Sequence, residues 1–545
     1  MTKYFVTTSL PYANGPLHLG HLLEHIQADI WVRFKKMQGH TCVFVSGDDA
    51  HGSAIMFSAE KKQQTPEDYI HSVWQSHSKD LKDAQIGFDL FYTTRSEHNR
   101  KQVSSMYQSL EAHGYINEKS IRQAYDEEKH MFLPDRYIKG TCPMCAAADQ
   151  YGDNCEQCGA TYLPSELKNP YSVLTGSTPS EKASNHAFFA LSACQDRLTA
   201  WLASADLQEP VKNKLGEWLE VGLQDWDITR DAPYFGFAIP GRDQQYFYVW
   251  MDAPIGYLST LQRYDEIHKT ALFAEVWKPD SAWHVWHFIG KDIVNFHGVF
   301  WPSVLSCCNL RTPTGLHVHG FLTINGEKMS KSRGTFVTAR QYLDAHHADY
   351  LRYYMAAKLN ASVVDIDLNW HDFSKRCSSD LVGKVVNIGS RCASFIHKYF
   401  DAKVLAFPSS TPLLQGMTQQ KASIEKHYTE CSFSQVVKDI MLLADQVNQY
   451  IDHEQPWKKA KDPSQLTDVH LVCSSALHAF KLLMTYLAPI IPDTSDKVAK
   501  MFGQQALLWS DIGHFDRAFS IDVFPRLLER IDFAAWFEKE CEIPL

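Results

Sequence analysis

The amino-terminal segment places the strongest constraint on the fold. Residues 3–52 begin with an apolar β-rich run, continue through a glycine-containing loop and an amphipathic run, and end in a second β-rich run. The apolar side chains of the amphipathic run recur at helical spacing, and they are Leu19, Leu22, Leu23, Ile26, Ile30 and Phe34. A strand, a loop, a helix and a second strand in this order predict the opening of a parallel α/β sheet.

The rest of the chain predicts that an insertion divides this sheet domain and that helices follow it. Between about Tyr115 and Asp231 the sequence is rich in turns and carries cysteines, and strand and helix alternation then resumes. From about Asp380 onward the periodicity is helical. The predicted segments are a first half of the sheet domain, the insertion, a second half, a linking region and a helical domain, at residues 1–114, 115–230, 231–320, 321–380 and 381–545.

Composition sets broad limits on the class of protein. A chain of 545 residues that is 45% hydrophobic and 21% charged is long enough for three or four domains with their own cores. No apolar run approaches the roughly 18 residues of a membrane span, and the first ten residues lack a signal peptide, so we expect a soluble cytoplasmic protein. The net charge of -10 argues against a surface that binds nucleic acid everywhere, but it leaves a local basic stripe possible.

Two histidines stand at the head of the first predicted helix. A helix amino terminus offers unpaired N–H groups to a phosphate, and His18 and His21, three residues apart, would add donors on one face. Gly15 and Gly20 have the spacing of a phosphate-binding loop, but histidine and leucine occupy the positions where that loop carries lysine and serine or threonine. The alternative is that both histidines only cap the helix or fill a crevice.

A second polar segment, "NGEKMSKSRGTF", lies about 300 residues later. Lys328 and Lys331 stand beside two serines, with Gly326 and Gly334 as hinges, which suits a mobile cationic clamp on a polyanion. The alternative is a solvated surface turn.

Together the two stretches resemble the two signature sequences of class I aminoacyl-tRNA synthetases, which are usually written HIGH and KMSKS. Here the first reads HLGH and the second matches in full. The resemblance implies that His18 and His21 bind the phosphates of ATP. It also implies that Lys328 and Lys331 bind ATP and stabilise charge as pyrophosphate leaves.

Four of the thirteen cysteines form two C-x-x-C pairs, which indicates reduced thiols and a metal. Their spacing is two, nine and two residues, which lets two tight turns deliver four thiolates to one tetrahedral zinc. Four sulfur ligands leave no open position, so we expect a structural metal. The ligands would be Cys142, Cys145, Cys155 and Cys158; the alternative is four unconnected core thiols.

This knuckle, placed between the two signatures, resembles that of the methionyl-tRNA synthetases, and the resemblance extends over essentially the whole chain. "LPYANG", "GDDAHG", "RDAPYFGF" and "YVWMDAPIGY" are all close to segments of that family. The resemblance implies a Rossmann-like catalytic domain split by a zinc-binding insertion and followed by a carboxyl-terminal α-helical anticodon-binding domain. The implied activity attaches methionine to methionine-accepting tRNA, initiator and elongator, through methionyl-adenylate, with Mg²⁺ accompanying ATP.

The resemblance also assigns a methionine site. A thioether favours apolar and aromatic surfaces, and an ammonium needs a carboxylate. Asp49 would bind the α-amino group, Arg230 would lie near the reacting groups, and Lys291 and Asp292 near ATP. The side-chain pocket would comprise Leu10, Tyr12, Trp250, Ala253, Pro254, Tyr257 and His297. The alternatives are ordinary core packing for the aromatic residues and a loop cap for Asp49.

Positions that match the family's anticodon-reading residues lie in the helical part of the chain. Projected as a uniform helix, residues 376–398 place a basic stripe opposite an apolar face. This stripe includes Asn387 and Arg391, which, together with Trp457, match the anticodon-reading positions. A solvated basic face is the alternative.

Two rival functions remain open. A zinc-dependent nucleic-acid-binding module could retain an inactive synthetase fold, and a small-molecule nucleotidyltransferase can share the HxGH phosphate site.

Homocysteine lacks only one methyl group of methionine, so we expect some correction of misactivated homocysteine. Since the chain ends without the appended dimerising domain of longer relatives, we expect a monomer.

Overall fold

The structure is a computed structural model that describes residues 1–134, 137–152, 155, 157–158, 160, 162, 166–329 and 336–541. Its centre is a six-stranded sheet in the order β10-β15-β14-β1-β2-β3, and every neighbouring pair is parallel. The strands are β1 (Lys3–Thr8), β2 (Thr41–Asp48), β3 (Leu90–Thr93), β10 (Asp206–Leu207), β14 (Trp283–Gly290) and β15 (Gly315–His319). The predicted parallel α/β sheet is therefore confirmed.

The two halves of this sheet meet along β1, which pairs with β2 on one side and β14 on the other. Lys3 lies opposite Thr41 in β2 and Trp283 in β14, so the carboxyl ends of all three strands reach the same edge. Loops at this edge are where ligands bind in open α/β sheets. Segments separated by about 240 residues thus contribute to one site.

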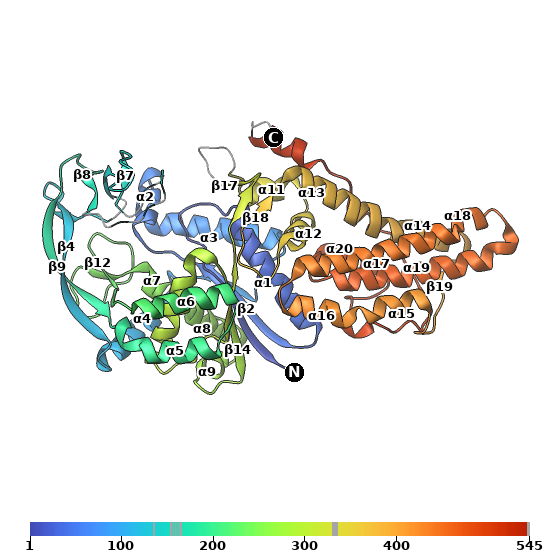
Figure 1. Ribbon diagram of the computed structural model, residues 1–545, viewed down its shortest axis with the longest axis horizontal. Helices are drawn as coiled ribbons and strands as arrows, with labels where there is room; N and C mark the ends of the chain where they lie inside the picture. The colour runs from blue at the N-terminus through green and yellow to red at the C-terminus, as the bar shows by residue number, and fades with distance from the viewer. Residues whose placement is uncertain are drawn as a thin grey trace.

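Helices alternate with the strands of the central sheet, and several of them pack on it (Figure 1). They are α1 (Leu19–Met37), α2 (Ser53–Lys61), α3 (Pro66–Asp83), α4 (Glu97–Ala112), α5 (Gln195–Ser204), α6 (Glu209–Val221), α7 (Val249–Asp252), α8 (Gly256–His268), α9 (Leu272–Trp277), α10 (Trp301–Cys307), α11 (Ala339–Ala345) and α12 (Ala348–Lys358). The α1 helix is buried on more than its apolar stripe: Glu24, Gln27 and Lys35, which the sequence places on other faces, are buried too. The cause is that α1 lies between the sheet and the carboxyl-terminal helices.

The insertion forms separate small sheets at one end of the molecule (Figure 1). One antiparallel sheet contains β4 (Ile116–Asp126), β5 (Met131–Phe132), β9 (Ser180–Phe189) and β11 (Trp226–Asp227), and another contains β6 (Ile138–Thr141), β7 (Gln150–Tyr151) and β8 (Lys168–Ser172). A short hairpin pairs β12 (Thr229–Asp231) with β13 (Gln245–Phe247). Within the same predicted segment, however, β10 pairs with β15 of the central sheet. The segment boundaries stay a proposal.

The carboxyl-terminal part is helical and packs against α1. Its helices are α13 (Trp370–Arg376), α14 (Asn387–Tyr399), α15 (Pro412–Gln419), α16 (Lys421–Thr429), α17 (Phe433–Glu454), α18 (Pro456–Lys459), α19 (Leu466–Leu487), α20 (Pro492–Met501) and α21 (Phe533–Cys541). Two small sheets accompany them: β16 (Leu322–Ile324) with β17 (Glu327–Lys328) and β18 (Ile366–Leu368), and β19 (Lys403–Val404) with β20 (Phe519–Ser520). Phe34 of α1 stacks on Tyr428 at 4.6 Å between ring centroids, so one core spans both parts.

The uniform helical projection of residues 376–398 is wrong in its first half. A π-helix, Cys377–Val386, joins α13 to α14, and its wider turn changes the angle between successive side chains. The basic side chains also meet acidic partners: Lys384 lies 2.9 Å from Asp445. No described helix is long and apolar enough to cross a membrane.

A buried ion pair joins α1 to α12, and it supports a prediction on stability. Arg352 Nη2 donates to Asp29 Oδ2 at 2.6 Å, and both side chains are buried. Arg352→Met should lower the free energy of unfolding by about 3 kcal/mol, because it leaves the Asp29 carboxylate with only part of its compensation. Arg526→Met removes an exposed pair with Glu529 and should change the same quantity by less than about 0.5 kcal/mol in denaturant unfolding. Equal effects of the two substitutions would contradict the prediction.

Candidate active site

The two histidines of the first signature cap α1 with their rings. His18 Nδ1 accepts the N–H of Gly20 at 3.1 Å, and His21 Nδ1 accepts the N–H of His18 at 3.2 Å. The rings stack at 3.7 Å between centroids. Because Nδ1 of each ring accepts a hydrogen bond, each proton must sit on Nε2, which makes Nε2 a donor. Capping and phosphate binding are therefore compatible roles, since the cap sets the tautomer that donates.

His21 is uncharged at neutral pH. Burial, reinforced by the neighbouring imidazoles of His18, His25 and His77, lowers the pKa of His21 well below its ordinary value. The helix end thus presents N–H donors without a fixed cation.

The segment around the second signature lies against this helix end. Leu19 N–H donates to Val337 O at 3.3 Å, Ala339 N–H donates to Leu17 O at 2.8 Å, and Phe336 packs edge-on against the His18 ring at 5.4 Å. Lys328 ends β17, while its side chain and all of Lys331 lie outside the described residues. The flanks of both signatures nevertheless converge on one place.

A cavity of about 1030 Å³, lined by described residues of both halves of the sheet, opens at this place. Met329, next to Lys328, lines it together with both histidines. Most of the residues predicted for the methionine and ATP sites line it as well: Leu10, Tyr12, Asp49, Arg230, Trp250, Ala253, Pro254, Tyr257, Asp292 and His297. Lys291 is not among the described residues that line this cavity, and its Nζ lies 2.5 Å from Asp365 Oδ1. Its predicted contact with ATP stays a prediction.

Asp49 is a buried carboxylate that directly follows the last residue of β2. Its backbone is tied to the first loop, since Ala13 N–H donates to Asp49 O at 2.8 Å. Among the described residues, no group donates to its buried Oδ1. Burial, followed by the nearby charge of Asp252, raises the pKa of Asp49 well above its ordinary value. A buried acid of this kind is complementary to an incoming cation.

The apolar end of the cavity has one fixed polar pair. His297 Nδ1 lies 3.1 Å from Ile293 O and must donate to it, so Nε2 accepts from the Tyr257 hydroxyl at 2.8 Å. Burial lowers the pKa of His297 to about 4, which keeps the ring neutral. Trp250 stacks on Phe296 at 3.8 Å. The lining suits a flexible apolar side chain that carries one weak acceptor.

The sequence analysis missed a carboxylate–histidine pair, Glu24 and His319, beside the two signature histidines. Glu24 lines the cavity, its Oε1 accepts the Ser9 N–H at 2.7 Å, and its Oε2 lies 3.4 Å from His319 Nε2. Although burial opposes ionisation, His319 lowers the pKa of Glu24, and Glu24 raises that of His319. The available signal was position, because Glu24 follows His21 by three residues and shares its face of α1.

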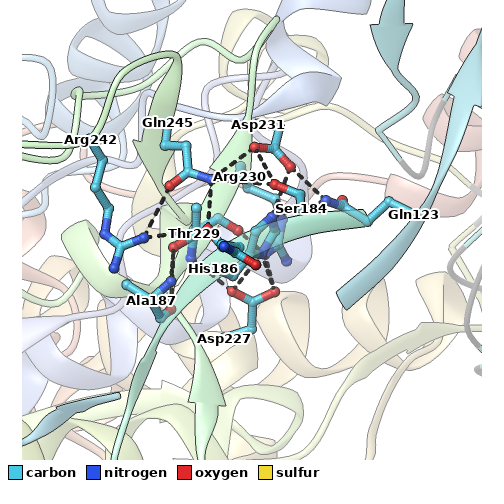
Figure 2. Close-up of polar contacts among 11 residues, drawn as sticks. Gln123, Ser184, His186, Ala187, Asp227, Thr229, Arg230, Asp231, Arg242 and Gln245 are labelled. Carbon is cyan, nitrogen blue, oxygen red and sulfur yellow. Dashed lines mark hydrogen bonds and ion pairs between the residues drawn. The ribbon is translucent and has the colours of Figure 1, made fainter. Parts of the chain in front are cut away.

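Arg230 lies on β12, close to Asp227 and His186 (Figure 2). Its guanidinium carbon is 3.8 Å from the Tyr248 ring centroid, and Nη1 lies 3.6 Å from Asp227 Oδ2. Nη1 also donates to Thr229 O at 2.7 Å, so this cation in the wall of the cavity contacts an aromatic face, a carboxylate and a backbone carbonyl.

The four predicted cysteine ligands form one cluster. Their sulfur atoms all lie within 4.8 Å of one another, with 3.9 Å between Cys142 and Cys158 and 3.5 Å between Cys145 and Cys155. Four sulfurs around a zinc, at about 2.3 Å each, would be separated by about 3.8 Å. In each C-x-x-C turn the second cysteine N–H donates to the first sulfur at 3.4 Å. The cluster could bind one zinc ion.

Comparisons with known proteins agree with this geometry. The family described as class I tRNA synthetases (M) matches residues 4–393. The methionine–tRNA ligase of Thiobacillus denitrificans is 49% identical over 531 residues, which are 97% of this chain and 77% of that protein. The chain belongs to the methionine–tRNA ligase family. The corresponding enzyme of Dichelobacter nodosus is 47% identical over 532 residues, 98% of this chain and 79% of that protein.

Solved structures of this family share the fold. The Mycobacterium tuberculosis methionyl-tRNA synthetase in complex with methionyl-adenylate has a TM-score of 0.79 and 23% identity, and the match covers 96% of this chain and 100% of that chain. The free form of that enzyme has a TM-score of 0.72 at 21% identity, over 97% of this chain and 98% of that one.

The anticodon-binding domain of tRNA ligases matches residues 413–522, which include Trp457. The structure places the guanidinium carbon of Arg391 at 4.6 Å from the Trp457 ring centroid, although the two residues lie on different helices. Asn387 begins α14 one turn before Arg391. In this methionine–tRNA ligase family member, the three predicted anticodon positions therefore lie in one region.

Proposed function

We propose that the chain catalyses the ATP-dependent attachment of methionine to methionine-accepting tRNA through methionyl-adenylate. One observation carries the proposal: the capped histidine pair, the flanks of the lysine-bearing segment and the buried Asp49 carboxylate surround a single cavity. A nucleotidyltransferase for a small molecule would not require the anticodon-binding domain that matches residues 413–522. An inactive nucleic-acid-binding module would not require Asp49 beside a phosphate site.

In the first step Asp49 binds the substrate ammonium, and the thioether enters the pocket between Trp250 and the Tyr257–His297 pair. The methionine carboxylate oxygen attacks the α-phosphorus of ATP, and the bond from this phosphorus to the pyrophosphate oxygen breaks. Catalysis then depends on position and charge, since no side chain acts as a nucleophile.

The phosphates lie at the head of α1 in this proposal. The Nε2–H groups of His18 and His21 donate to phosphate oxygens beside the backbone N–H groups of the helix end. Lys328 and Lys331 stabilise the departing pyrophosphate, and Asp292 and Lys291 bind ATP. Glu24, which the sequence analysis did not predict as a site residue, offers acceptors for nucleoside hydroxyls.

In the second step a hydroxyl of the terminal tRNA adenosine attacks the methionyl carbonyl, and AMP leaves. Asn387, Arg391 and Trp457 read the anticodon of initiator and elongator tRNA. Such reading suits single-stranded loops, whose bases can stack on aromatic side chains.

We further propose that the chain works as a monomer in the cytoplasm and that misactivated homocysteine is released as a thiolactone. A single methyl group supplies only about 1–3 kcal/mol of discrimination, so binding alone leaves misactivation. Thiolactone release no faster than the uncatalysed rate would exclude this correction.

The cysteine cluster supports a proposed structural zinc, and Mg²⁺ would arrive with ATP. Zinc would stabilise the fold of the loop-rich segment and would take no part in the chemistry of the cavity. Cys155→Ser should lower the zinc content from about one ion per chain to a small fraction, because three thiolates bind far more weakly than four. Cys308→Ser, at a half-buried cysteine outside the cluster, should retain full zinc. Elemental analysis of both purified variants decides, and full zinc in the Cys155 variant would contradict the site.

Methionine-dependent exchange of pyrophosphate into ATP tests the first step, and aminoacylation of methionine-accepting tRNA tests the second. Exchange without aminoacylation would favour a nucleotidyltransferase. Loss of both with intact tRNA binding would favour a binding module.

A further inference from the structure

A buried histidine lies between two carboxylates where the insertion joins the central sheet. His186 on β9 places Nδ1 at 2.9 Å from Asp227 Oδ2 and Nε2 at 2.8 Å from Asp231 Oδ2. Figure 2 shows the imidazole between the two acids, which come from β11 and β12. Three strands from two separate sheets thus meet on one ring.

The contacts favour the charged form of this ring. A neutral imidazole has one N–H and one lone pair, so it would direct its lone pair at one of the two carboxylates. Burial alone lowers the pKa of His186, but hydrogen bonds and charges from Asp227 and Asp231 outweigh burial and raise it. Each carboxylate then receives a charge-assisted hydrogen bond.

Asp231 has several further polar partners, whereas Asp227 accepts one backbone hydrogen bond, from Thr229 N–H at 3.0 Å, and meets a second cation. Asp231 also accepts from Gln123 at 2.6 Å, from Ser184 at 3.0 Å and from Gln245 at 3.0 Å. The Oδ2 atom of Asp227, already bonded to His186, lies 3.6 Å from Arg230 Nη1. Asp227 is therefore shared between a buried imidazolium and the arginine in the cavity wall.

We infer that His186 is a positioning residue for Arg230. When His186 is charged, the imidazolium offsets the negative charges of Asp227 and Asp231. The guanidinium of Arg230 can then direct its positive charge into the cavity. Without the imidazolium, the Asp227 carboxylate would attract Arg230 more strongly and draw the guanidinium away from the substrates, at a point where anionic phosphates must approach. The inference rests on the proposed function, since it assigns His186 to adenylate formation.

A double-mutant cycle tests this inference. The rate of methionyl-adenylate formation is measured in a single turnover with enzyme in excess, so that slow variants can also be measured. His186→Gln should lower the rate at saturating substrates by about 10-fold, because positioning effects of this size follow small displacements, and should leave the KM for methionine within about 2-fold. In an Arg230→Ala background the same substitution should cost less than about 2-fold, because its effect passes through Arg230.

Controls separate this role from a purely structural one. His427→Gln removes another histidine–aspartate pair, with Asp439 at 3.1 Å, and should leave the rate unchanged. Asp227→Asn keeps the His186–Asp231 pair and removes the carboxylate nearest Arg230, so it should leave the rate within about 2-fold of wild type and, combined with His186→Gln, should restore most of the lost rate. If His186→Gln does not fold alone, this double variant provides the test, and a loss of about 10-fold in Asp227→Asn alone would overturn the inference. Equal rate factors with and without Arg230 would overturn the inference. A wild-type protein that forms no adenylate would instead overturn the proposed function, and with it this role.

Discussion

Replacement of Asp49 by asparagine should lower kcat/KM for methionine in the exchange reaction by about 30-fold or more, because truncating one side of a buried charge pair costs about 2–5 kcal/mol. The isosteric amide keeps the shape of the site and removes only the charge. Asp243→Asn, an exposed loop substitution, should leave the exchange kinetics unchanged.

Two inhibitors assign the loss to the substrate ammonium. L-Methioninol carries the ammonium without the carboxylate, and it should bind the Asp49→Asn variant far more weakly than the wild type. 4-(Methylthio)butanoate lacks the ammonium, and it should bind both proteins equally. A variant that loses both inhibitors to the same extent would show a collapsed pocket, contrary to the proposed contact.

The same carboxylate sets a pH dependence. Burial and Asp252 raise the pKa of Asp49 in the free protein, and the substrate ammonium binds only the ionised form. Protons and methionine therefore compete, so the KM for methionine should rise as the pH falls through the raised pKa, and be lowest above it. The Asp49→Asn variant should lack this rise, and a rise of the same size in that variant would exclude Asp49 as its source.

The parallel sheet and the cysteine cluster could be predicted from the sequence because their signals are local. Helical spacing from Leu19 to Phe34 and the first two strands predicted the parallel sheet, because periodicity reports which side chains face a core. The spacing of the four cysteines predicted their cluster for a similar reason, since two tight turns determine where four sulfurs lie.

The features that sequence could not predict depend on partners far along the chain. Glu24 is buried and ionised through His319, which is 295 residues away. Lys291 meets Asp365, which is 74 residues away. The π-helix Cys377–Val386 changes the helical angle without an evident local signal, and a uniform projection misplaced the stripe for that reason. Such pairings follow from tertiary packing, which periodicity does not report.

Replacement of Trp457 by alanine should raise the KM for methionine-accepting tRNA by about 10- to 100-fold, since stacking of one base on an aromatic ring contributes about 1–3 kcal/mol. Arg391 lies over the same ring at 4.6 Å, which orients the indole before tRNA binds. Methionine-dependent exchange should remain at the wild-type rate, because this helical region takes no part in adenylate formation.

The anticodon dependence of the Trp457 effect is its strongest test. With methionine-accepting tRNA of altered anticodon, wild type and variant should charge equally poorly, because the lost contact is then absent from both. Trp457→Phe retains an aromatic face and should recover part of the loss, whereas Leu471→Ala, which removes an apolar side chain 43% exposed on α19, should have no effect. If Trp457→Ala charged both tRNAs less well by one common factor, the indole would support the fold of the helices instead of reading a base. The anticodon-reading role would then fail while adenylate formation remained intact, since Figure 1 shows α18 at one end of the molecule and α1, which carries the histidine pair, near its middle.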